Sequence, residues 1–154
     1  MTQLSNDDYN SELQRKGHLA FSWDELDKIT LPTGIETKMF KVGDPSAMTS
    51  PTVFKVFYPP DCFVEAHTHD CNYTEIILEG TQRVGATWHK AGDIRVGLAN
   101  RGYGPLVAGP DGATVLFVFE DGRWPALTIG NNDGSTLGSE VIEAHVAKNN
   151  ETSS

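Results

Sequence analysis

The sequence predicts an all-β protein, an antiparallel sandwich or barrel. Short apolar runs rich in β-branched and aromatic residues recur along the chain, with Gly- and Pro-containing segments between them. No long segment between these runs shows a helical period, which favours strands joined by turns over helices. The chain has 154 residues, including 15 Gly and 8 Pro. A chain of this length is typical of one domain.

Residues 1–30 are predicted to form an N-terminal extension outside the β-rich part. Residues 1–17 are polar, and their start is expected to be mobile. Ser22 followed by Glu25 fits a capping box, in which each side chain accepts a hydrogen bond from the other residue's backbone N–H at a helix start. We therefore expect one helical turn over Trp23–Lys28.

The central part, residues 31–125, is predicted to form a single β-barrel. Strands are expected where β-forming residues run together, and turns where Gly and Pro gather, as in Gly102–Gly112. The expected strands are Ile35–Val42, Val53–Tyr58, Phe63–Thr68, Tyr73–Leu78, Gln82–Trp88, Ile94–Leu98 and Ala113–Glu120.

Residues 126–154 are predicted to be a C-terminal tail, because the apolar pattern ends after Trp124. Within it, Gly130–Gly138 has the composition of a linker and Glu140–Lys148 can form a short helix. The last residues, Asn149–Ser154, are expected to be disordered.

Charge and composition narrow the range of partners. The 12 basic and 21 acidic residues give a formal charge of −9, which argues against nucleic acid and anionic membranes. An anionic small molecule stays possible, because one local Arg can hold it. The absence of a long apolar stretch and of a secretory signal indicates a cytoplasmic protein. Cys62 and Cys71 are then expected to be reduced thiols.

Two histidines two residues apart form the strongest candidate site. In a strand, residues i and i+2 point to the same face, so His67 and His69 would share one space. On the following strand, Tyr73 and Glu75 share one parity and could bring a phenol and a carboxylate toward them. Two His and one carboxylate are typical of non-haem iron sites. Alternatively Glu75 faces solvent, since both parities of that strand carry apolar residues.

These residues belong to segments that resemble known motifs. Pro59–His69, followed by Tyr73 and Gly80, is similar to the first cupin motif, and Ala91–Pro105 resembles part of the second. The resemblance covers residues 31–124. It implies a small antiparallel β-barrel or jelly roll with one divalent metal inside, and a homodimer as the common assembly.

The match departs from the cupin pattern at two positions. Tyr73 stands where the family has its Glu, and Tyr103 stands close to where it has its last His. The resemblance therefore carries over His67 and His69 as metal ligands. Tyr73 and Glu75 are candidates to complete the metal's first shell, and Tyr103 is a candidate to orient or deprotonate a substrate.

The resemblance implies a small-molecule enzyme. We consider two enzyme functions and one non-catalytic alternative. The first, which is favoured, is a non-haem metal oxygenase or dioxygenase acting on a small oxygenated or carbonyl compound, with Fe(II) favoured over Mn, Ni, Zn and Cu. The second is a metal-dependent lyase or isomerase with a Tyr as acid or base. The third is a non-catalytic ligand-binding cupin. In the enzymes, Tyr103, Tyr73 and Glu75 would be catalytic.

Arginines in or beside the predicted strands are candidates for holding a substrate carboxylate. Arg95 lies in the apolar run Ile94–Leu98, where a solvated charge is unexpected, and Arg83 lies in another predicted strand. A guanidinium can bind a carboxylate through two parallel hydrogen bonds. The alternative is that these side chains face outward with their charge in water. His89, next to Trp88, is expected to lie outside the site.

Overall fold

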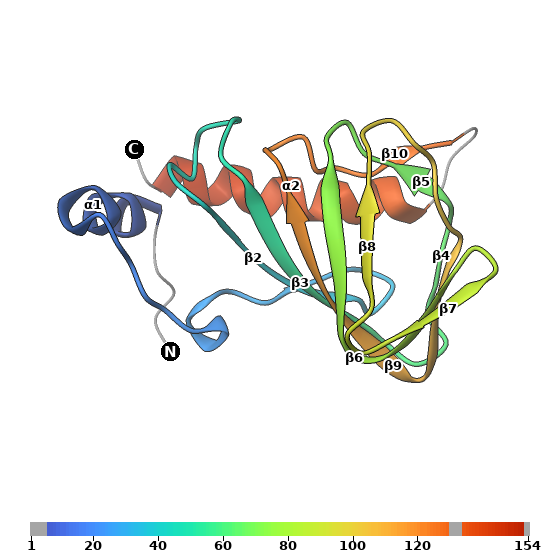
Figure 1. The fold of residues 1–154 in the computed structure, drawn as a ribbon. Helices are drawn as coiled ribbons and strands as arrows, with labels where there is room; N and C mark the ends of the chain where they lie inside the picture. Colours follow the sequence, from blue (N-terminus) through green and yellow to red (C-terminus); the bar gives the residue numbers. More distant parts are fainter. Residues whose placement is uncertain (1–5, 130–133, 153–154) are drawn as a thin grey trace.

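The structure is a computed structural model that describes residues 6–129 and 134–152. Within these residues, ten strands follow an N-terminal helix, α1 (Asn6–Lys16), and precede a C-terminal helix, α2 (Gly134–Thr152), in the sequence. Figure 1 shows α2 running across the strands and α1 at one side of them. A 3₁₀ turn occupies Trp23–Glu25. The strands are β1 (Ile29–Thr30), β2 (Glu36–Lys41), β3 (Thr52–Tyr58), β4 (Phe63–Val64), β5 (His67–Thr68), β6 (Tyr73–Val84), β7 (Thr87–Lys90), β8 (Ile94–Gly97), β9 (Leu106–Phe119) and β10 (Leu127–Thr128).

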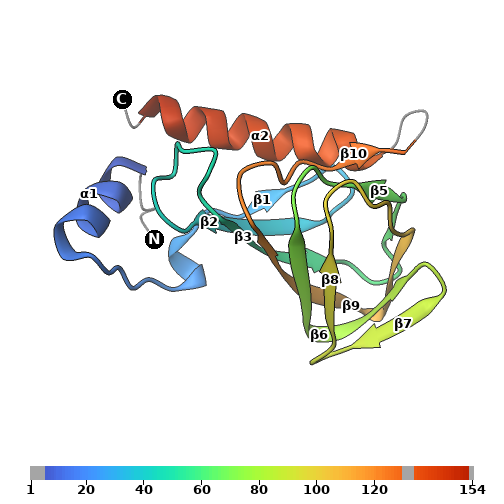
Figure 2. The ribbon, with the colours of Figure 1, turned by 45° about the horizontal axis from the view of Figure 1, so that its top comes forward.

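Every strand pair in the described residues is antiparallel. The main sheet has the order β1-β2-β3-β9-β6-β7, with β8 paired to β6 and β4 paired to β9. A second, two-stranded sheet pairs β10 with β5. The long strands β6 and β9 bend, so that the sheet curls back on itself (Figure 2). The predicted antiparallel all-β architecture is therefore confirmed.

Alternation along the central strands fills the interior of the barrel. On β3, Phe54, Val56 and Tyr58 are buried, and on β9 the same is true of Val115 and Phe117. These residues are β-branched or aromatic and lie two apart, so one face of each strand points inward.

The C-terminal helix closes one side of the barrel. Figure 2 shows α2 running across the strands beside β10 and β1, with which it is in contact. Ile142, on the helix face toward the barrel, is buried. In the described part of the chain, no helix is both long and apolar enough to cross a membrane.

The ends of the chain contain more helix than the sequence pattern indicates. In α1, Asp7 and Asp8 occupy the first turn and Arg15 and Lys16 the last, an arrangement that opposes the helix dipole and stabilises a polar helix. The predicted turn at Trp23–Lys28 is shorter, and the Ser22 side chain makes no capping hydrogen bond.

The C-terminal segment also differs from the expectation. The helix predicted over Glu140–Lys148 begins already at Gly134 and ends at Thr152. It takes in part of the predicted linker and part of the predicted disordered end. Residues 130–133 and 153–154 lie outside the described residues.

Two glycines lie where the sequence pattern predicts turns, but in the structure they bend strands that continue past them. Strand β6 continues through Gly80, and β9 starts at Leu106 and runs through the predicted turn region past Gly112. Both glycines have positive φ, and a Cβ added at Gly80 would collide with the Gly112 carbonyl. The register of the two strands shifts at this point. Glycine here permits a close approach and a bend, and pairing continues on both sides.

Candidate functional site

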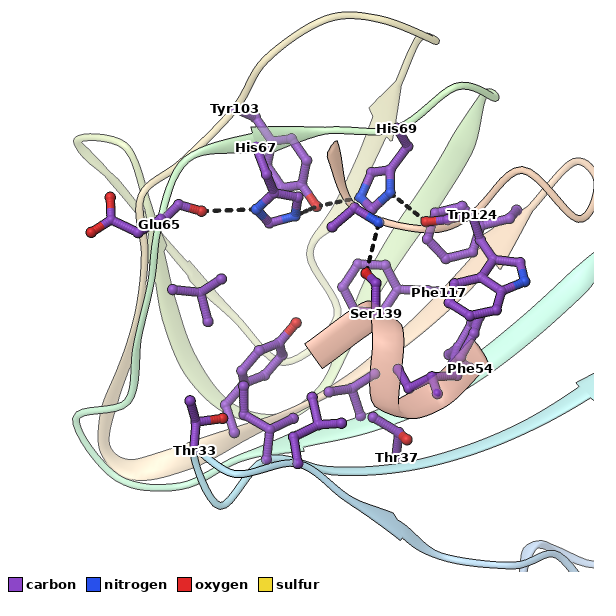
Figure 3. Close-up of a pocket in the computed structure, with 18 of the residues that line it drawn as sticks. Thr33, Thr37, Phe54, Glu65, His67, His69, Tyr103, Phe117, Trp124 and Ser139 are labelled. Atoms are coloured by element: carbon purple, nitrogen blue, oxygen red, sulfur yellow. Dashed lines mark hydrogen bonds between the residues drawn. The ribbon is translucent and has the colours of Figure 1, made fainter. Parts of the chain in front are cut away.

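A cavity of about 330 Å³ lies inside the barrel, under α2. One end carries His67, His69 and Tyr103, and most of the remaining wall is apolar, as Figure 3 shows. The cavity is lined by Leu31, Thr33, Ile35, Thr37, Phe54, Val56, Tyr58, Phe63, Val64, Glu65, His67, His69, Tyr103, Phe117, Phe119, Trp124, Ala126, Ser139 and Ile142.

Backbone carbonyl groups fix the orientation of both imidazoles. His67 Nδ1 lies 2.8 Å from the Glu65 carbonyl oxygen, and His69 Nδ1 lies 2.6 Å from that of Trp124. A carbonyl oxygen only accepts, so each Nδ1 carries the proton and donates it. The Nε2 atom of each ring then faces the Tyr103 hydroxyl. A carbonyl behind Nδ1 is the usual support of a metal-binding His.

The Tyr103 hydroxyl lies between these two Nε2 atoms. It is 2.8 Å from Nε2 of His67 and 3.0 Å from Nε2 of His69. Backbone pairing explains this position, because Tyr103 and His67 exchange two N–H to C=O hydrogen bonds of 3.0 Å each. Gly104 follows Tyr103 with a φ of 107°, a conformation that glycine adopts without strain.

Burial disfavours a charge on Tyr103 and on His69. Desolvation raises the pKa of Tyr103 well above its ordinary value, with Glu75 adding to the effect, so the phenol keeps its proton. Desolvation also lowers the pKa of His69 to about 4, and the neighbouring His67 acts in the same direction. At neutral pH, His69 therefore offers a lone pair at Nε2.

Glu75 and Arg95 form an ion pair behind Tyr103. Glu75 is 1% exposed, and its Oε2 lies 2.6 Å from Nη1 of Arg95. The guanidinium also lies 4.7 Å from the centre of the Tyr103 ring, a cation–π contact. Burial raises the pKa of Glu75, and Arg95 opposes this shift. Neither residue lines the cavity, and their predicted roles as ligand and substrate contact remain predictions.

The other predicted site residues lie farther from the two histidines or behind them. The Tyr73 ring is buried, with its centre 5.0 Å from that of His69, and desolvation raises its pKa to about 12. Arg83 donates to the Gly85 carbonyl at 2.6 Å and does not line the cavity. His89, expected outside the site, lies on β7 and is 3.9 Å from Asp93.

Residues at the end of the predicted barrel and after it also contribute to the site. The Trp124 carbonyl holds His69, and Ser139 and Ile142 of α2 line the cavity. The Ser139 hydroxyl accepts a hydrogen bond of 2.9 Å from the Ala126 backbone N–H. The local pattern in this segment is weakly apolar, so nothing in it points to a cavity.

The atoms at the polar end of the cavity suit a divalent transition metal. Two imidazole nitrogens and one phenol oxygen meet there, and the single hydroxyl proton can serve only one of the two contacts at a time. Ligand atoms that share an octahedral cation with bonds of about 2.1 Å lie about 3 Å apart. Within the described residues, no cluster of three or more His, Cys, Asp or Glu side chains forms a fuller site. His67 and His69 are therefore the candidate ligands, and the protonated Tyr103 hydroxyl lies beside them.

Comparisons with known proteins bear mainly on the fold. No model of a known protein family matches the sequence, and no curated protein is significantly similar to it. Solved structures do match. An RmlC-like cupin protein from Ralstonia eutropha JMP134 is 12% identical, with a TM-score of 0.61, over 88% of this chain and 91% of that one.

Two further structures show the same architecture. An RmlC-like cupin from Shewanella frigidimarina NCIMB 400 is 15% identical, with a TM-score of 0.56, over 66% of this chain and 88% of that one. Oxalate decarboxylase from Bacillus subtilis is 20% identical, with a TM-score of 0.55. The match covers 68% of this chain but only 29% of that enzyme. The curled antiparallel sheet and these structural matches show that the chain has the cupin fold.

Proposed function

We propose that this chain is a metal-dependent cupin enzyme that moves a proton on a small oxygenated molecule, as a lyase or isomerase does. The observation that carries the proposal is the position of the Tyr103 hydroxyl, within 2.8 and 3.0 Å of two imidazole Nε2 atoms. A phenol held at this place can exchange a proton with a molecule in the cavity. A substrate oxygen that gains negative charge in the reaction would accept the hydrogen bond or the proton of that phenol.

The residues of the site would divide the work as follows. His67 and His69 hold the cation, with their tautomers fixed by backbone carbonyls. A bound divalent cation supplies a Lewis acid at this end of the cavity. Tyr103, whose pKa is raised by burial, keeps its proton and donates a hydrogen bond to a substrate oxygen that gains negative charge. The apolar wall excludes water from that oxygen.

Metal binding is tested first, because both enzyme functions depend on it. The purified protein, loaded in turn with Fe(II), Mn, Ni, Zn and Cu and then dialysed, is expected to retain one equivalent of a divalent metal by elemental analysis. His67→Ala and His69→Ala should each lose it. His89→Ala serves as the matched control, because His89 lies on β7 outside the cavity. Failure of the wild type to retain any metal would contradict the proposal.

The role of Tyr103 is tested by proton exchange. In D₂O, the metal-loaded protein is expected to speed the exchange of the α-hydrogens of 1-tetralone, a neutral ketone, as followed by NMR. Tyr103→Phe removes only the hydroxyl and should slow this exchange about 100-fold or more. Its metal content should change less than that of the His variants. Unchanged exchange in Tyr103→Phe would remove Tyr103 from the mechanism.

An oxygenase is the second candidate. Its support is the pair of imidazoles facing an apolar cavity, a setting suited to Fe(II) and O₂. It ranks second because the carboxylate expected to complete such a site, Glu75, is paired with Arg95. Oxygen uptake by the Fe(II)-loaded protein with substrate would favour it over proton transfer. A protein that binds both metal and ligand without turnover would instead match the non-catalytic alternative.

A further inference from the structure

The wall of the cavity is apolar over most of its area. Aromatic side chains from three parts of the chain form one side, among them Phe54 of β3, Phe117 of β9 and Trp124 before β10. Figure 3 shows these rings grouped away from the Glu65 side of the cavity. Burying such a surface against another apolar surface is favourable, whereas a polar group placed there loses its hydration.

No cationic side chain of this wall is available to a charged substrate. Among the residues of the described chain that line the cavity, none is Lys or Arg. The nearest guanidinium, that of Arg95, already pairs with Glu75 at 2.6 Å behind the Tyr103 ring. The one carboxylate in the lining, Glu65, faces away from the cavity (Figure 3). A substrate carboxylate lying in the apolar part would be unpaired, which is costly.

Polar atoms that remain available are concentrated at one end. Around the Tyr103 hydroxyl, two imidazole nitrogens provide further polar contacts. Elsewhere on the wall, two of the hydroxyls already have a hydrogen-bond partner. Thr37 donates to the Ile29 carbonyl at 3.2 Å, and Ser139 accepts from the Ala126 N–H at 2.9 Å. The cavity thus suits a molecule with one polar head and an apolar body.

The volume sets the size of that molecule. An apolar cavity of about 150 Å³ holds one benzene ring, and this cavity has about twice that volume, about 330 Å³. A fused two-ring molecule or an aliphatic chain of similar bulk would fill it. Oxalate, the substrate named for one structurally similar protein, is far smaller and carries two negative charges.

We propose that this cavity binds an uncharged, mainly apolar molecule of about two-ring size, with its single oxygen function at Tyr103, and rejects dicarboxylates. The position of the oxygen rests on the proposed function, whereas binding of the apolar body does not. The inference rests on the volume of the cavity, its apolar lining and the lack of Lys and Arg in that lining. It does not depend on a bound metal.

Calorimetric titration of the metal-free protein tests this with three probes. Neutral 1-tetralone is expected to bind with a stoichiometry of one and to raise the melting temperature. The two-ring anion 2-naphthoate should bind at least about tenfold more weakly, since its carboxylate finds no cation. Oxalate should show no binding. Equal or tighter binding of oxalate would overturn the inference.

Two variants locate the binding site. Ala126→Phe adds bulk to the cavity wall and should weaken 1-tetralone binding while the smaller ketone cyclohexanone still binds. Leu78→Phe, a similar enlargement on an exposed side chain, is the control and should leave binding of both unchanged. Thr33→Arg, at an exposed position of the lining, should strengthen 2-naphthoate binding. No change in any probe's affinity with either cavity variant would place the binding elsewhere and overturn the inference.

The outcomes separate this inference from the proposed function. If His67→Ala loses the metal but still binds 1-tetralone, both stand. If the wild type retains no metal yet binds 1-tetralone and not oxalate, the proposed enzyme falls and the cavity's ligand class stands. If the metal binds as proposed but oxalate is the preferred ligand, the inference about the ligand is wrong and the proposed function is unaffected.

Discussion

Among the single residues of the candidate site, Tyr103 is the one that contacts His67, His69 and Arg95. Its backbone pairs with that of His67, and its hydroxyl contacts both imidazoles. The Arg95 guanidinium lies against its ring. Because the ring is held on two sides, the hydroxyl has little freedom to leave the histidines. Tyr103 therefore contacts both imidazoles through its hydroxyl and also lines the cavity.

The stability of the metal-free protein is expected to depend on pH through His69. Its pKa is lowered from 6.5 to about 4 in the folded chain. Between those values the unfolded chain binds a proton that the folded chain does not, so acidification across this window favours unfolding. The free energy of unfolding should fall by roughly 3 kcal/mol from this residue as pH drops from about 6.5 to about 4.

Urea unfolding at several pH values measures this dependence. His69→Asn removes the titrating group, so its free energy of unfolding should vary less with pH over the same window. His89→Asn, at a position outside the cavity, should keep the slope of the wild type. An identical slope in the wild type and His69→Asn would exclude His69 as its source.

The sequence indicates some of these residues and not others, for physical reasons. His67 and His69 are two apart, and the period of a strand alone predicts that they share a space. The pairing of Glu75 with Arg95 could not be predicted, because it depends on the register between β6 and β8. That register places the two residues directly opposite each other, which local sequence does not encode.

Among the secondary-structure elements, the long strands β6 and β9 owe their bends to glycines. Gly and Pro residues predict turns, and at Gly80 and Gly112 they instead allow two long strands to bend and cross closely. Sequence pattern gives the same signal for a turn and for a bend. The existence of the strands was therefore predictable, whereas the continuity of β6 and β9 was not.

Gly97 on β8 makes room for a ring of the site. It lies directly opposite Tyr73 on β6, and a Cβ at this position would overlap the Tyr73 ring. Gly97→Ala is therefore expected to displace the ring and to destabilise the fold by about 1–3 kcal/mol, measured by chemical denaturation. Val96→Ala, at an exposed neighbouring position, should change the stability by less than about 1 kcal/mol. Equal effects of the two changes would contradict this account.

The surface of the whole molecule bears on its assembly. Strand β8 pairs on one side with β6 and, among the described residues, has no strand on its other side. Its outward side chains Ile94 and Val96 are 63% and 76% exposed, and Leu98 follows them. An apolar edge strand of this kind favours pairing with another strand. The predicted homodimer would place two β8 strands side by side about a two-fold axis.

Sedimentation equilibrium tests this assembly. The wild type is expected to sediment as a dimer, and Val96→Asp should shift it toward the monomer, because two carboxylates would meet near the axis. Thr87→Asp adds the same charge at an exposed position on β7 and should leave the dimer intact. A wild type that sediments as a monomer, or a dimer unaffected by Val96→Asp, would contradict an interface at β8.

The pairing of β5 with β10 and the position of α2 have a consequence for biosynthesis. The two histidines lie in the first half of the chain, yet the carbonyl that holds His69 and the side chains that close the cavity come from Trp124 onward. During synthesis on the ribosome, both histidines are therefore made well before the residues that complete the cavity wall. Binding of the proposed ligand would require that α2 has emerged and docked, so a product truncated before α2 should not bind it.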